Sequence, residues 1–83
     1  MKKFKYLVVE IESRGDVVER NIEFSDLEIE EFCNKLYEEG VKERGLEDEV
    51  EYLEEFGGVC EVEDYYYEVN LGEEIGFDVY RVG

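Results

Sequence analysis

Carboxylates are the side chains of this chain that could do chemistry, because 25 Asp and Glu face only nine Lys and Arg. Alternate residues of a strand lie about 6.6 Å apart, and residues i and i+4 of a helix lie about 6 Å apart. Both intervals are close to the roughly 6–7 Å between phosphates along one DNA strand. Strand spacing is expected for Glu10 and Glu12, Glu19 and Glu23, and Glu61 and Glu63, and helical spacing for Glu39 and Glu43, and for Glu47, Glu51 and Glu55.

The same inventory leaves little room for catalysis. The chain has no His, which excludes Ser–His and Cys–His pairs and mixed His–carboxylate metal sites. Cys33 falls in an apolar helical stripe, where a buried thiol is expected, and the Asp residues show no calcium-loop spacing. We therefore expect no enzyme, no metal and no cofactor. A domain that binds cations through clustered carboxylates is the alternative.

The net charge of −16 must be carried by a folded chain, since 14% aromatic and 43% hydrophobic residues are too many for an acidic disordered tail. Self-repulsion of that size destabilises a compact state and calls for an environmental or functional reason. The 83 residues suffice for one domain. No apolar run is long enough for a membrane span or a signal peptide, so we expect a cytoplasmic protein.

Alternating hydrophobicity predicts two strands, over Lys3–Glu12 and Val17–Phe24, joined by a turn at Ser13–Asp16. Arg20 falls on the apolar face of the second strand, which predicts an edge position or a carboxylate partner. Ser25–Glu28 has the sequence of a capping box, and it predicts a helix that runs to Arg44 and ends at Gly45.

A shorter helix is expected over Glu47–Phe56, ended by Gly57 and Gly58. The apolar parity then changes near Glu63 and Asp64, which indicates a bulge or a turn within a β segment. A last strand covers Ile75–Val82. The predicted order is β-β-α-α-β-β, an α+β two-layer sandwich in which an antiparallel sheet of about four strands carries the helices on one face.

Aromatic side chains are expected on the sheet face away from this core. If the strands pair as predicted, Phe4 and Tyr6 share that face with Tyr66 and Tyr80. A tyrosine-rich open face favours self-association or anchoring to a partner. Packing of the same residues under a terminus or a loop is the alternative.

In size, charge and lack of catalytic groups, the chain resembles the acidic inhibitors of phages and mobile elements, among them DNA-mimicking anti-restriction and anti-CRISPR proteins. The resemblance is one of overall character, and no functional residues are carried over with it. It implies an inhibitor that occupies the basic nucleic-acid-binding surface of a host enzyme, such as a CRISPR effector or a restriction enzyme. It also implies action in the host cytoplasm without direct binding to nucleic acid.

The densest acidic run is the contact face that the residues themselves predict. It comprises Glu47, Asp48, Glu49, Glu51, Glu54 and Glu55, with Glu61 and Glu63 beside it. The main alternative is a structural homodimer module from a thermophile, whose Glu-rich, Gln-free composition would serve heat tolerance and solubility.

Overall fold

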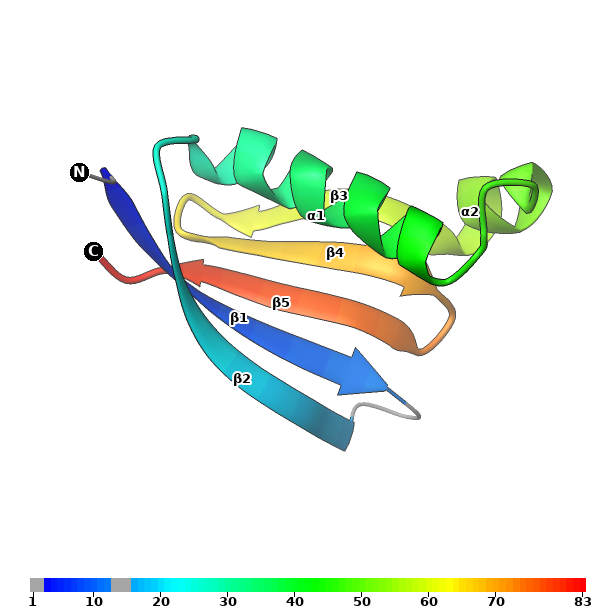
Figure 1. Cartoon of the computed structure of the whole chain (residues 1–83), viewed down its shortest axis with the longest axis horizontal. Helices are drawn as coiled ribbons and strands as arrows, with labels where there is room; N and C mark the ends of the chain where they lie inside the picture. Colours follow the sequence, from blue (N-terminus) through cyan, green and yellow to red (C-terminus); the bar gives the residue numbers. More distant parts are fainter. Residues whose placement is uncertain (1–2, 13–15) are drawn as a thin grey trace.

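A computed structural model describes residues 3–12 and 16–83. The sheet has five strands in the spatial order β2-β1-β5-β4-β3, and every neighbouring pair is antiparallel. Both helices lie on the same side of this sheet, over β3 and β4 (Figure 1). The elements are β1 (Phe4–Glu12), β2 (Asp16–Ser25), α1 (Ile29–Glu43), α2 (Val50–Phe56), β3 (Gly57–Glu63), β4 (Tyr66–Gly72) and β5 (Ile75–Arg81).

The α+β class is confirmed, but the sheet has five strands where about four were predicted. The difference arises at the parity change, where Asp64 and Tyr65 form a turn that divides the expected β segment into β3 and β4. The second helix ends at Phe56 as predicted, but it begins at Val50 and not at Glu47, and its C-cap Gly57 is extended and opens β3 directly. The predicted turn residues Ser13–Gly15 lie outside the described residues.

The link between β2 and α1 carries the chain across the sheet, because α1 follows the edge strand β2 but packs over β4 and β3, and α2 leads into the opposite edge strand β3. A Schellman arrangement ends α1: the amide of Leu46 donates to the carbonyl of Val41, and the amide of Gly45 donates to that of Lys42. Gly45 has φ +66°, the left-handed conformation that this motif requires. The predicted end of the first helix at Gly45 is therefore confirmed.

The beginning of α1 differs from the expected capping box. Glu28 occupies the N-cap position without a side-chain hydrogen bond. The Ser25 hydroxyl instead accepts from the amide of Leu27 at 3.0 Å, because Ser25 is the last residue of β2 and lies before the helix start. The link between β2 and α1 is thus held by a local turn and not by a reciprocal cap.

The core fills the space between α1 and the sheet. It contains Tyr6, Val8, Ile29, Phe32, Cys33, Tyr67, Val69 and Val79. The ring of Tyr6 stacks on that of Phe32 with centroids 4.3 Å apart, and the Tyr6 hydroxyl donates to the carbonyl of Leu27 at 2.6 Å. None of the helices in the described residues is long and apolar enough to cross a membrane.

Candidate functional site

The acidic residues are distributed unevenly along the chain. Residues 45–83 hold 13 of the 25 carboxylates but only one cation, Arg81, which gives this part a net charge of −12. In the fold, most of this part forms α2, β3 and β4, at the end of the sheet opposite β2. Negative charge is therefore concentrated at one end of the molecule, which we call the acidic end, defined as residues 46–64.

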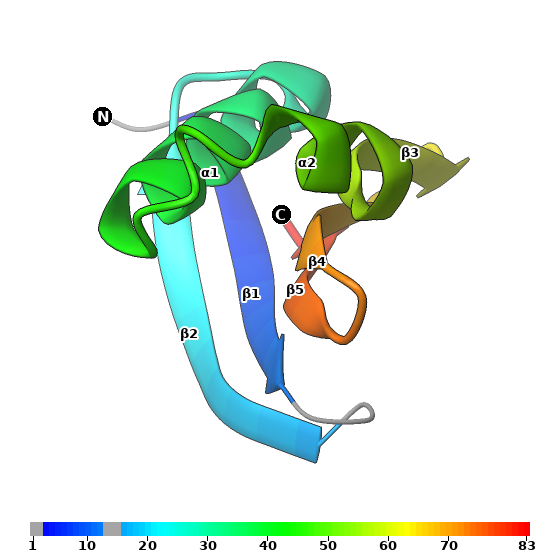
Figure 2. The same cartoon turned by 90° about the vertical axis from the view of Figure 1, so that its right-hand side faces the viewer.

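Packing fixes α2 to the sheet although none of its residues is fully buried. The amide of Glu73, in the turn between β4 and β5, donates to the Tyr52 hydroxyl at 3.1 Å. The ring of Tyr52 also lies 5.1 Å from that of Phe56. The carboxylates of α2 are consequently presented from a helix that is anchored to the sheet, and Figure 2 shows this helix beside β3 and β4.

The eight predicted contact residues all lie in the acidic end, and all eight are exposed. Among the residues that the structure describes, the ion pairs lie elsewhere: Arg44 contacts Glu12 at 2.8 Å and Glu10 at 3.6 Å, Lys35 contacts Glu39, and Arg81 contacts Glu28. None of these ion pairs reaches the acidic end, whose charge is therefore left uncompensated.

Three of the predicted carboxylate spacings are wrong. Glu19 and Glu23 share a face of β2 but are four residues apart, about 13 Å along a strand. Glu47 precedes α2, which begins at Val50, so only Glu51 and Glu55 are one helical turn apart. A register shift lies between Glu61 and Glu63, which pair with Tyr67 and Tyr66 respectively. Since directly paired residues share a face, these two carboxylates lie on opposite faces of the sheet, whereas one common face was expected. The bulge at Val62 causes this change.

The predicted aromatic group is divided between the two faces of the sheet. Tyr6 belongs to the core and is fully buried, and Phe4 packs against that core. Tyr66 and Tyr80 lie on the open face, where their rings stack 4.5 Å apart with an angle of 8° between them. The expectation that Phe4 and Tyr6 lie away from the core is wrong, because β1 pairs with β5 so that Tyr6 and Val8 face α1.

A second cluster of polar groups, which the sequence reasoning missed, surrounds the stacked tyrosines. The Tyr66 hydroxyl lies 3.3 Å from carboxylate oxygens of both Glu68 and Asp78. Burial raises the pKa of Asp78, the charge of Glu68 raises it further, and the hydrogen bond from Tyr66 lowers it. The pKa of Tyr66 is raised by burial and then by these two carboxylates. Alternation along β4 and β5 places all three side chains on the open face. This alternation is the sequence signal from which their shared face could have been predicted.

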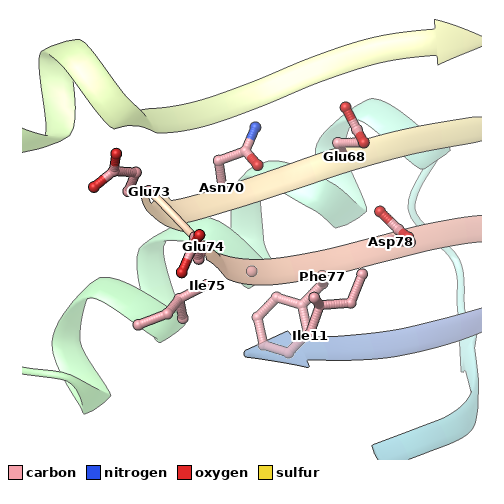
Figure 3. A pocket seen from close by; sticks show the side chains of 9 residues that line it. Ile11, Glu68, Asn70, Glu73, Glu74, Ile75, Phe77 and Asp78 are labelled. Carbon is pink, nitrogen blue, oxygen red and sulfur yellow. The ribbon is translucent and has the colours of Figure 1, made fainter. Parts of the chain in front are cut away.

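An open hollow of about 430 Å³ adjoins this cluster (Figure 3). Carboxylates and an amide line it together with apolar side chains: Glu68, Asn70, Glu73, Glu74 and Asp78 with Ile11, Ile75 and Phe77. In the described part of the chain, no three Cys, Asp or Glu side chains are arranged to hold a metal ion. The hollow offers hydrogen-bond acceptors and negative charge, and it has no nucleophile paired with a base.

The two cysteines differ in exposure, since Cys33 is buried and Cys60 is exposed. Burial raises the pKa of the Cys33 thiol to about 12, so this thiol is protonated and unreactive at neutral pH. The predicted burial of Cys33 in the stripe of α1 is confirmed.

Comparison of the chain with protein-family models, with curated proteins and with solved structures found no match.

Proposed function

We propose that this protein is a non-catalytic inhibitor that docks its acidic end onto the basic nucleic-acid-binding surface of a host defence enzyme, with carboxylates in place of phosphates. A CRISPR effector or a restriction enzyme is the kind of target that fits. The proposed inhibitor acts in the host cytoplasm and binds no nucleic acid itself.

One observation carries the proposal: the acidic end, residues 46–64, contains nine carboxylates and no Lys or Arg. All nine of these carboxylates are exposed. A group of like charges held on an ordered scaffold produces a strong local field, which steers association with a surface of opposite sign. Solubility alone would be served equally well by charge spread evenly over the molecule, so the uneven distribution favours a directed role.

The test is a DNA-cleavage assay with purified CRISPR effectors and restriction enzymes, to which the protein is added at increasing ratios. We expect stoichiometric inhibition of at least one of these enzymes at low salt. Neutralisation of Glu49, Glu51, Glu54 and Glu55 to Gln should weaken that inhibition about tenfold or more, because charges at the contact surface set the association rate.

A matched control carries the same change of charge on α1, as Glu30, Glu31, Glu38 and Glu43 to Gln. These four residues are also exposed, and the control should inhibit within about threefold of the unmodified protein. Equal losses in both variants would mean that only net charge matters. Absence of inhibition across both enzyme classes would contradict the proposal.

A homodimeric structural module is the second candidate. The observation in its favour is the stacked pair Tyr66 and Tyr80 on the open face of the sheet. Sedimentation and thermal unfolding separate the candidates, since a tight dimer with a very high melting temperature and no basic partner would favour the structural module.

A further inference from the structure

The edge strand β2 is exposed along almost its whole length. Nine of its ten residues are exposed, and only Ser25 at its end is buried. In the described part of the chain, β2 pairs only with β1. Figure 2 shows that the far halves of β1 and β2 extend beyond the helical layer. A long exposed edge is a template for a further strand.

The two faces of β2 differ in chemistry. Glu19, Asn21 and Glu23 point toward a groove of about 280 Å³ between α1 and the β1–β2 hairpin. Three further carboxylates are close by: Glu10 from β1 and Glu39 and Glu43 from α1 line the same groove. Two of these have cations in reach, Arg44 at 3.6 Å from Glu10 and Lys35 at 3.9 Å from Glu39. The groove side of β2 is therefore acidic.

The opposite side of β2 is apolar at Ile22 and Phe24 and carries one cation, Arg20, which pairs with Val9 of β1. Ile22 and Phe24 are 49% and 56% exposed, and their partners on β1 are Leu7 and Lys5. A strand added to β2 would continue the same alternation, with every second side chain on the groove side and the others on the apolar side. The matching segment thus alternates basic and apolar residues.

We propose that β2 accepts an extended segment of a basic partner protein as a sixth strand, with alternate Lys or Arg side chains over the acidic groove and apolar side chains against Ile22 and Phe24. Backbone hydrogen bonds would hold the segment, and the two faces would select it. The charges disfavour a second copy as the occupant, because antiparallel β2–β2 pairing in phase with these faces brings acidic side against acidic side. This inference goes beyond the proposed function, since β2 and the acidic end lie at opposite edges of the sheet.

The test uses a nine-residue peptide with blocked ends that alternates Val and Lys, followed by amide NMR shifts and fluorescence anisotropy. We expect shifts in the amides of Asp16–Ser25. Two further peptides should each bind about tenfold more weakly or worse: one of the same composition with contiguous lysines, and one N-methylated at alternate residues. The double variant Glu19→Lys/Glu23→Lys should no longer bind the peptide of alternating Val and Lys, and it should bind a peptide of alternating Val and Glu.

The control Glu31→Lys/Glu38→Lys, at two exposed residues of α1 outside the groove, has the same net charge and should bind the Lys peptide within about threefold of the unmodified protein. Shifts confined to α2 and β3 would overturn the inference while leaving the proposed function intact. Equal binding of the N-methylated peptide would also overturn it, and this measurement needs no variant. Concentration-dependent shifts of β2 amides without peptide would identify a second copy as the occupant, contrary to the inference.

Discussion

Replacement of Tyr6 by Phe isolates one buried hydrogen bond of the core. The Tyr6 side chain is fully buried, and its ring stacks on Phe32 at 4.3 Å. Its hydroxyl donates to the carbonyl of Leu27 at 2.6 Å, which ties β1 to the link between β2 and α1. The substitution keeps the ring and removes only the hydroxyl, so the change in stability reports on this bond.

The expected cost is about 1.5 kcal/mol of unfolding free energy. A typical intramolecular hydrogen bond contributes about 1 kcal/mol net, and a partly buried carbonyl left without its donor costs more. Since 1 kcal/mol moves the melting temperature of a domain of this size by about 4–8 °C, Tyr6→Phe should melt roughly 6–12 °C lower.

Thermal and urea unfolding followed by circular dichroism measure this difference. The control is Tyr65→Phe, because Tyr65 is 53% exposed, and its effect should stay within about 0.5 kcal/mol. If Tyr6→Phe were as stable as the control, the stabilising hydrogen bond from the Tyr6 hydroxyl to the Leu27 carbonyl would be refuted. A change of oligomeric state in Tyr6→Phe without loss of stability would instead support the surface role that the sequence pattern suggested.

Three further predictions concern stability, and urea titrations check each of them. A Cβ at Gly76 would overlap the backbone carbonyl oxygen of Val69 on the paired strand, so Gly76→Ala should cost about 2 kcal/mol or more. Burial raises the pKa of the Cys33 thiol from 9.0 to about 12, so the unfolded chain loses this proton at a lower pH than the folded protein does. The free energy of unfolding should therefore be constant below pH 9 and fall as the pH rises toward 12. The variant Cys33→Ala should show a smaller fall. The pKa of Asp78 is raised mainly by burial, so the folded state binds this proton more tightly, and stability gains from Asp78 as the pH falls through its folded pKa. Asp78→Asn should accordingly stabilise the protein at pH 7 and remove that gain.

The strands show most clearly what the sequence could and could not determine. Both faces of β1 are apolar, with Phe4, Tyr6 and Val8 on one and Leu7 and Val9 on the other. Alternation therefore predicts a strand without showing which face meets the helices. That choice depends on the pairing of β1 with β5, about 70 residues later in the chain, which no local pattern contains.

Local signals were sufficient where the backbone itself requires a particular residue. Gly45, in the left-handed conformation, ends α1 where the sequence indicated. Arg20 on the apolar side predicted an edge position, and β2 is an edge strand. The Ser25 signal was misread as a cap because the serine hydroxyl can satisfy a nearby amide in a turn as well as at a helix start.

The exposure of the acidic run followed from the sequence, since unpaired carboxylates are rarely buried. The distance of this run from the cations could not be predicted from the sequence, because Arg44 is brought next to Glu10 and Glu12 of β1 only when the chain folds. The cluster of Tyr66, Glu68 and Asp78 likewise forms only when β4 and β5 pair in the observed register.

The salt dependence of binding to an inhibited nuclease tests the central claim most directly. The affinities of the unmodified protein and of the Glu49/Glu51/Glu54/Glu55→Gln variant would be measured by displacement of labelled DNA between low and physiological salt. If carboxylates of the acidic end replace phosphates, the logarithm of the affinity should fall steeply with the logarithm of salt concentration, and the variant should show a shallower slope. The same slope in both proteins, or an affinity independent of salt, would contradict the claim.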